Sequence, residues 1–377
     1  IAIMERKILK ISIFITIGAI AFLSGYLFMP EKELERQTNQ NFAPPNLDRQ
    51  AGLITERFSN KAEVGSSEIK VPNTLPLSSR KFITFVNQSS DSEKIVAVAN
   101  NGDIVKIDIN NLTEKVIYTG KTSIAEAILS PTGNSVIYSF YDTGNTKKNI
   151  YLNLSAKSGK GESFDIPWNL KSAAFSPYGD QTAYLVSSEN GGELLISKGV
   201  NVVKQALKTR LGAAIVAWPS DFLSIISYNK DGYGDLFVLK ENGAFNKTIS
   251  YQYDLNAKWS PSGDKIIFSA KDNNGSDRLF YQDIKNNGAV VALDININAS
   301  KCVLTNEEKI ICGLKNQSQL KDEFYEISAI DGSKKLILTP SANILIKEMA
   351  LNRAGDTLFA LNNIDGKLYV LNIGEQD

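Results

Sequence analysis

Apolar runs of four to seven residues recur along the chain from residue 81 onward, and Gly, Asn, Asp or Ser bounds each run. In each repeating unit an apolar run leads into a turn of the type Ser-Pro-x-Gly-Asp, and a run of β-branched and aromatic residues follows. The fullest copies are AFSPYGDQTAYL (174–185) and KWSPSGDKIIF (258–268). Such runs between turn residues are typical of β-strands and hairpins. Since Pro restricts one turn position and Gly accepts a positive φ, the motif predicts a tight connection.

Seven copies of this unit are present, with a spacing of about 41 to 47 residues. Their turns begin near Ser89, Ser130, Ser176, Trp218, Ser260, Thr305 and Asn352. A third apolar run follows in each copy, and a fourth follows in the first six, as in GDLFVLK (234–240) and NKTISY (246–251). No segment between the runs is long and periodic enough for an ordinary helix. Four short strands at this period predict an all-β fold, a seven-bladed β-propeller over residues 67–377.

The seventh copy reaches only its third run, GKLYVLN (366–372). A missing fourth strand would leave an unpaired sheet edge, which natural β-proteins avoid. The segment SEIKVP (67–72) resembles KLILTP (335–340) and precedes the first opening run, KFITFV (81–86). We therefore predict that Ile69 to Val71 forms the outer strand of the last blade. The alternative is that 67–72 is only a linker.

A different pattern occupies the start of the sequence. Residues 11–29, ISIFITIGAIAFLSGYLFM, carry no charge and are long enough to cross a bilayer as a helix. Arg6, Lys7 and Lys10 precede this run, so the preference of Lys and Arg for the cytoplasm places the N-terminus inside. A retained anchor is favoured, and a cleavable signal peptide is the alternative.

These features predict three parts: a cytoplasmic N-terminus with a transmembrane anchor helix (1–30), a polar, flexible stalk (31–66) and the propeller (67–377). The stalk prediction depends on the polar composition and the Pro44-Pro45 pair. The expected protein is a single-pass protein of the cytoplasmic membrane, with an extracytoplasmic, periplasmic propeller in the cell envelope.

Charge and composition narrow the chemistry. Lys and Arg number 41 and Asp and Glu number 41, so no global field attracts nucleic acid, and no nucleic-acid partner is expected. The chain contains no histidine, which excludes Ser-His-Asp and Cys-His catalysis and imidazole metal sites. We expect no enzymatic activity and no cofactor. Carboxylate-pair chemistry, as in glycosidases, remains open on composition alone.

Acidic residues gather among Gly and Asn in predicted turns: Asp142, Asp231, Asp235, Asp254, Asp272 and Asp277. Because Asp in such turns normally caps its own backbone, a structural role is favoured over a catalytic one. The segments NKDGYGD (229–235) and DNNGSD (272–277) invite comparison with calcium loops. A calcium site requires several carboxylates at alternate positions, whereas Asp272 and Asp277 bracket two asparagines, with Lys271 and Arg278 as opposing charges. Both loops have a length suited to joining the second and third strands of a blade, so connecting hairpins are favoured and no metal site is expected.

The two cysteines, Cys302 and Cys312, flank the turn of the sixth copy and are predicted to face one another across antiparallel strands. The Cβ separation of such pairs, about 4.5 to 5.5 Å, is a little wide for a disulfide. A disulfide and two buried thiols both remain open, and the buried thiols are favoured. The spacing Cys-x-x-Cys of redox motifs is absent.

Aromatic residues concentrate where the later loops of a blade should emerge. The predicted partner- or ligand-binding face consists of Tyr141, Asp142, Trp168, Lys230, Tyr233, Tyr253 and Asp254, with Tyr251 nearby. Tyr and Trp dominate binding hot spots, which favours a face that contacts a protein or a glycan. The alternative is that several of these aromatics, Tyr251 above all, pack between blades.

The Ser-Pro-x-Gly-Asp turns and the strands GDLFVLK and GKLYVLN resemble the WD-like (PD) repeats of TolB-type β-propellers over residues 81–377. This resemblance implies a propeller outside the cytoplasmic membrane that binds other envelope proteins. Similar repeats form the propellers of dipeptidyl-peptidase and prolyl-oligopeptidase enzymes, whose hydrolase domain carries a Ser-Asp-His triad. Without histidine, peptidase activity is not carried over.

The leading functional hypothesis is therefore a non-enzymatic, membrane-tethered propeller that binds another protein or an envelope ligand through its loops. An accessory subunit of a larger envelope complex is a related hypothesis. The alternatives are a carboxylate-based enzyme acting on glycans and a dipeptidyl-peptidase-like propeller remnant without the hydrolase domain.

Overall fold

A computed structural model describes residues 74–374 except for 89–93, 121–123, 156–160, 190, 212, 287, 306–308 and 317–320. All of these residues belong to one compact unit, Glu68–Asp377. The predicted anchor (1–30) and stalk (31–66) lie outside the described residues. Within the described part, no helix combines the length and apolar character that a membrane crossing needs.

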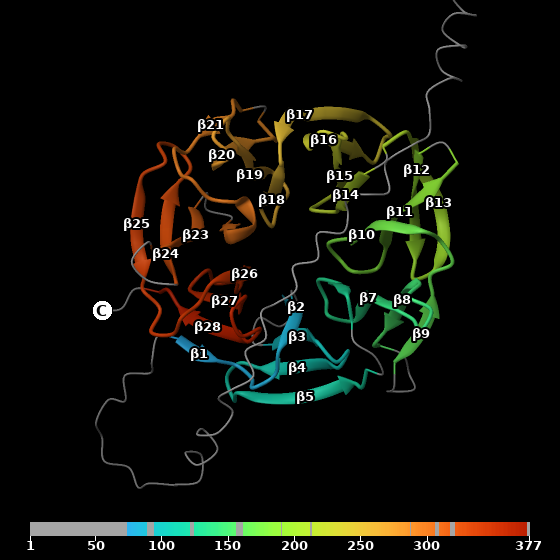
Figure 1. The fold of residues 1–377 in the computed structure, drawn as a ribbon, viewed down its shortest axis with the longest axis horizontal. Coiled ribbons are helices and arrows are strands. Elements are labelled where there is room, and N and C mark those ends of the chain that lie inside the picture. The colour runs from blue at the N-terminus through green and yellow to red at the C-terminus, as the bar shows by residue number, and fades with distance from the viewer. Residues whose placement is uncertain are drawn as a thin grey trace, which may run out of the picture. The chain divides into compact units, whose positions relative to one another are not determined.

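Seven four-stranded antiparallel sheets stand side by side in a ring, which is the predicted seven-bladed β-propeller (Figure 1). In six of the sheets the strands follow one another in sequence order, from an inner strand beside the central axis to an outer strand at the rim (Figure 1). The described residues contain one short helix, the 3-10 turn η1 (Ala299–Lys301), so the prediction of an all-β fold is confirmed.

The first four blades are complete in the order of the chain. The first contains β2 (Phe82–Asn87), β3 (Lys94–Ala99), β4 (Ile104–Asp108) and β5 (Thr113–Tyr118). The second contains β6 (Glu126–Leu129), β7 (Ser135–Tyr141), β8 (Lys147–Asn153) and β9 (Glu162–Asp165). The third contains β10 (Leu170–Phe175), β11 (Thr182–Ser188), β12 (Gly191–Lys198) and β13 (Asn201–Thr209). The fourth contains β14 (Ala213–Ala217), β15 (Phe222–Tyr228), β16 (Tyr233–Lys240) and β17 (Phe245–Tyr253).

The last three blades follow the same plan, and only the seventh borrows a strand. The fifth contains β18 (Asn256–Trp259), β19 (Lys265–Lys271), β20 (Asp277–Asp283) and the short β21 (Val291–Ala292). The sixth contains β22 (Cys302–Leu304), β23 (Lys309–Lys315), β24 (Asp322–Ser328) and β25 (Lys334–Leu338). The seventh contains β26 (Ile346–Leu351), β27 (Thr357–Asn362), β28 (Leu368–Asn372) and β1 (Thr74–Pro76).

The ring is closed by β1, which pairs antiparallel with β28 as the outer strand of the seventh blade (Figure 1). The prediction that a segment ahead of the first blade supplies the outer strand of the last blade is therefore confirmed. The strand that does so is Thr74–Pro76. The predicted segment, 69–71, lies outside the described residues. Pro76 suits this place because an outer strand needs no N–H on its free side. A motif match to KLILTP could not distinguish two nearby apolar-Pro segments.

Apolar side chains fill the spaces between neighbouring blades. For example, Ile267 and Leu279 of the fifth blade pack in one buried cluster with Leu304 and Ile310 of the sixth. Both faces of each sheet are covered in this way, so the middle strands are continuously apolar rather than alternating.

The recurring turn is explained by its serine. Ser176 is buried, and its Oγ accepts a hydrogen bond from the backbone N–H of Gln181 at 3.1 Å. Gly179 supplies the positive φ, 71°, that closes the turn. The same serine bond occurs at Ser130 and Ser260, with distances of 3.0 and 3.1 Å. The motif is thus a local device that reverses the chain between the first two strands of a blade.

Cys302 in β22 and Cys312 in β23 are register partners, as predicted, and they form a disulfide. The preference for two free thiols was wrong. Their Cα atoms are 4.1 Å apart, at the short end for antiparallel pairs, so the two side chains approach more closely than an average cross-strand pair.

Candidate ligand-binding face

Two sets of connections emerge at the same end of the propeller, because antiparallel strands reverse direction at each step. One set joins the second and third strands of a blade, and the other runs from an outer strand to the next inner strand. We call this end the loop face. The Ser-Pro-x-Gly-Asp turns emerge at the opposite end, which we call the turn face.

In three hairpins of the loop face, a polar side chain accepts hydrogen bonds from the backbone N–H groups of its own hairpin. Asp142 Oδ1 accepts hydrogen bonds from the backbone N–H groups of Gly144 and Thr146, both at 2.9 Å. Asp272 caps the corresponding hairpin of the fifth blade, and Asn229 caps that of the fourth. The structural role predicted for Asp142 and Asp272 is confirmed. Among the described residues, no three His, Cys, Asp or Glu side chains gather in a way that could hold a metal ion.

Three tyrosines form a stacked group at the loop-face end of the fourth blade. The rings of Tyr233 and Tyr251 are parallel, with centroids 4.1 Å apart and planes 7° apart. The ring of Tyr253 packs against that of Tyr233 with the centroids 5.3 Å apart and the planes tilted by 54°. Tyr251 and Tyr253 are 66% and 43% exposed. We call Tyr233, Tyr251 and Tyr253 the tyrosine patch.

A bulge in β17 turns Tyr251 into this patch. The pairing of β16 with β17 shifts register between Gly234 and Leu236, which leaves an extra residue on β17. Tyr251 adopts a φ of 52°, and its N–H donates to Asp235 Oδ1 at 2.7 Å. Bulges re-aim side chains, and a positive φ at a tyrosine is uncommon. The alternative that Tyr251 packs between blades is therefore wrong.

The hairpin beside the patch is shaped by Gly232. A Cβ at this residue, whose φ is +85°, would lie 3.0 Å from the Cε2 atom of Tyr253. The N–H of Asp254 donates to the Gly232 carbonyl at 3.0 Å, and Asp254 itself has a φ of 55°. The close contact between the hairpin and Tyr253 therefore depends on the missing side chain.

Ion pairs flank the tyrosine patch on both sides. Lys247 Nζ lies 2.7 Å from Asp235 Oδ2, and Lys271 Nζ lies 2.6 Å from Asp254 Oδ2. Burial acts to raise the pKa of Asp235, but hydrogen bonds from Lys247 and from the Tyr251 N–H hold this pKa below its usual value. The hydrogen bond to Asp254 raises the pKa of Lys271. The shift of each pKa favours the charged form, the carboxylate of Asp235 and the ammonium of Lys271.

The structure brings together only part of the predicted face. Tyr233, Tyr253 and Asp254 belong to one neighbourhood, and Lys230 lies in the adjoining hairpin. Tyr141 and Asp142 belong to the second blade, two blades away around the ring, although Tyr141 is 54% exposed (Figure 1). Trp168 is partly buried and packs on Tyr184 at 5.4 Å between the second and third blades. Trp168 is therefore a core residue of this junction.

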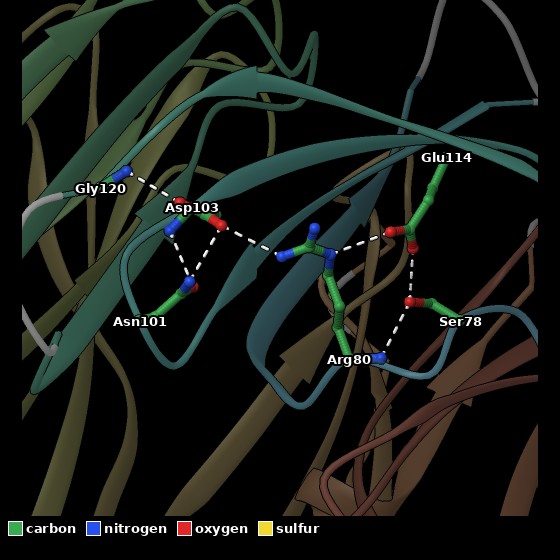
Figure 2. A network of polar contacts seen from close by, with 6 residues as sticks. All are labelled: Ser78, Arg80, Asn101, Asp103, Glu114 and Gly120. Atoms are coloured by element: carbon green, nitrogen blue, oxygen red, sulfur yellow. Dashed lines mark hydrogen bonds and ion pairs between the residues drawn. The ribbon is translucent and has the colours of Figure 1, made fainter.

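A polar network that the sequence did not predict lies near the closing strand (Figure 2). Arg80 bridges two acids: its Nη1 lies 3.0 Å from Asp103 Oδ2, and its Nε lies 2.9 Å from Glu114 Oε1. Ser78 donates to Glu114 at 2.6 Å, and the Gly120 N–H donates to Asp103 at 3.0 Å. The network fastens the connection between β1 and β2 to the rim of the first blade, so its role is structural.

Glu348 in the inner strand β26 is a second group that sequence reasoning missed. It accepts hydrogen bonds from Thr84 Oγ1, at 3.2 Å, and from the Phe85 N–H of the neighbouring inner strand β2. Burial raises the pKa of Glu348 above its usual value, and the charge of Lys258 opposes this rise. Glu348 thus joins the seventh blade to the first. No sequence signal marks it, because its partners are 263 to 264 residues away.

Solved structures share this fold at low sequence identity. The Kuenenia stuttgartiensis hydrazine synthase chain matches with a TM-score of 0.58 at 10% identity, over 84% of this chain and all of that chain. The Neurospora crassa Pan2 WD40 domain matches with a TM-score of 0.53 at 15% identity, over 79% of this chain and 90% of that chain. The propeller of the Pyrococcus furiosus Trilobed protease matches with a TM-score of 0.54 at 13% identity, over 79% of this chain and 97% of that chain. At these identities the similarities show the propeller fold alone.

The Trilobed protease propeller is described as having an open velcro topology, whereas β1 closes the ring here. TolB from Acinetobacter baumannii matches with a TM-score of only 0.45 at 15% identity, over 76% of this chain and 65% of that chain. The specific likeness to TolB therefore stays a sequence-based expectation. No protein-family model matches the chain, and no curated protein sequence matches it.

Proposed function

We propose that this protein is a non-enzymatic binding module, held at the cytoplasmic membrane by residues 11–29, that presents its loop face to another macromolecule of the cell envelope. The observation that carries the proposal is the tyrosine patch. Two of its three rings are substantially exposed, although tyrosine rings are large apolar surfaces that folding normally buries. Exposed, rigid tyrosines provide contact area at low entropic cost, as in many binding sites.

The backbone around the patch supports this proposal. Tyr251 and Asp254 both occupy the left-handed region, where a residue with a side chain costs about 1–3 kcal/mol. Such strain persists only where the surroundings hold it, and here Asp235 and Gly232 do so. These contacts fix the positions of the rings before any ligand binds, which favours a preformed contact surface.

The extracytoplasmic location is supported by the Cys302–Cys312 disulfide. Disulfides persist in oxidising compartments and are rare in the cytosol. This agrees with the orientation that Arg6, Lys7 and Lys10 indicate for the N-terminus.

Photo-cross-linking of the full chain in its native cell tests the proposal. A benzophenone side chain, which reacts with C–H bonds of any macromolecule, is placed at Lys230 on the loop face or at Tyr178 on the turn face. Tyr178 is a matched control because it is 84% exposed. We expect adducts from position 230 and none from position 178. Adducts from position 178 alone would contradict the proposed binding face.

A further inference from the structure

The outer face of the tyrosine patch is an open aromatic surface. Tyr251 uses one side of its ring to stack on Tyr233, and the side chain remains 66% exposed. The other side of the ring therefore faces solvent. The bulge and the Asp235 hydrogen bond hold the backbone of Tyr251, so the surface exists without a bound ligand.

Most charged groups around this surface lie in pairs of opposite sign. Asp235 pairs with Lys247 and Asp254 pairs with Lys271, and the adjoining hairpin carries Lys230 and Asp231, one charge of each sign, while Asp277 adds a further negative charge near Lys271. These groups leave no surplus of cations beside the rings. A phosphate or an acidic polymer would need surplus cations, as would single-stranded nucleic acid. The patch thus fits an uncharged ligand that combines an apolar flat side with polar edges.

A pyranose ring has this combination. When its hydroxyl groups are equatorial, its axial C–H groups form an apolar side, and the negative face of an aromatic ring attracts such C–H groups. The hydroxyl groups then lie at the rim, where ionised carboxylate and ammonium groups make strong hydrogen bonds. Asp254 and Lys271 are positioned at the edge of the patch to supply them.

We infer that the tyrosine patch is a carbohydrate-binding site that takes a neutral hexopyranose chain with equatorial hydroxyl groups, with one sugar ring stacked on Tyr251. This inference rests on the proposed function and narrows it to one ligand class. A protein partner at the same patch is the competing occupant, and the experiment below separates the two.

The test measures binding of chitotetraose and cellotetraose to the full chain in detergent by isothermal titration calorimetry, with tetragalacturonate as the acidic comparison. Tyr251→Ala should weaken binding of a neutral tetrasaccharide by about tenfold, the effect of losing one stacked ring. Tyr251→Trp should keep the affinity because it keeps an aromatic face. Tyr178→Ala, an exposed tyrosine on the turn face, should leave it unchanged. Circular dichroism melting verifies that each variant is folded.

Three results would overturn the inference. The first is the absence of binding by both neutral tetrasaccharides at millimolar concentration. The second is tighter, salt-sensitive binding of tetragalacturonate, which would show that the ligand is acidic. The third is equal loss of affinity in Tyr178→Ala. If no sugar binds and position 230 still cross-links to a protein, the carbohydrate inference fails while the proposed function stands.

Discussion

Some residues of this propeller stabilise the turn in which they lie, whereas others connect segments that are far apart in the sequence. Ser176 and Gly179 act within a few residues of their own position, so the motif that contains them predicts the turn they build. Glu348 acts on Thr84, on the other side of the ring closure, and its environment comes entirely from packing. When such a group has a pKa shifted by its packed environment, the free energy of unfolding depends on pH.

Glu348→Gln should gain stability over the wild type as the pH rises. Because burial raises the pKa of Glu348, the folded state disfavours the ionised form. The wild-type contribution is fully present below the unfolded pKa, about 4.3, and is lost as the pH rises through the raised folded value. Urea denaturation from pH 4 to pH 8 should show a difference that grows in favour of the variant. A difference independent of pH would refute this assignment.

Glu114→Gln is the matched control with the opposite sign. Burial acts to raise the pKa of Glu114, but hydrogen bonds from Ser78 and Arg80 hold it below the usual value. The stabilisation is therefore present above the unfolded pKa and is lost as the pH falls through the folded value. The variant should be less stable than the wild type at pH 7, and the difference should shrink at low pH.

At the scale of the strand pair, the register of a hairpin determines which residues are exposed and which face one another. The hairpin β16–β17 shifts register between Gly234 and Leu236, and the resulting bulge leaves Tyr251 exposed. The hairpin β22–β23 keeps a regular register, and its close cross-strand pair makes the disulfide. In both hairpins the residue types were recognised from the sequence, and the detailed pairing determined their roles.

Reduction of the disulfide should destabilise the sixth blade and, with it, the ring. The bond closes a loop with a sequence separation of 10, for which chain entropy gives about 2–3 kcal/mol. We expect dithiothreitol to lower the urea midpoint of the wild type. The double variant Cys302→Ala, Cys312→Ala should start from the lower midpoint and not respond to the reductant. Two free thiols in the unreduced, denatured protein would contradict the bond.

The whole molecule depends on a contact between the two ends of the described chain. Only three residues of β1 complete the seventh blade, and the Arg80 network ties the following connection to the first blade (Figure 2). Since each blade packs between two neighbours, a loosened closure affects both the seventh and the first blade.

Deletion of Thr74–Pro76 from the full chain should lower the melting temperature and promote self-association. The deletion removes the partner of β28 and exposes a sheet edge that can pair with another molecule. Differential scanning calorimetry and light scattering measure the two effects. Deletion of residues 64–66, ahead of the closing strand, is the length-matched control. Equal melting temperatures for the two deletions would show that β1 does not hold the ring closed.

The number of blades, the four strands of each blade, the turns and the principle of closure were all predictable before any coordinates. They are encoded by contiguous residues: short apolar runs, and turns such as Ser176 to Gly179 that bond within themselves. The aromatic character of the loop face was predictable for the same reason, as was the capping role of Asp142.

Only the tertiary structure decided which of these residues meet. Asp235 reaches Tyr251 because a bulge shifts β17, Cys302 bonds to Cys312 because two strands approach to 4.1 Å, and Glu348 meets Thr84 because the ring closes. Each contact depends on register or packing between segments, to which every residue of both segments contributes. A pattern of residue types along one segment does not contain this information, so which of the predicted residues lie together became clear only from the fold.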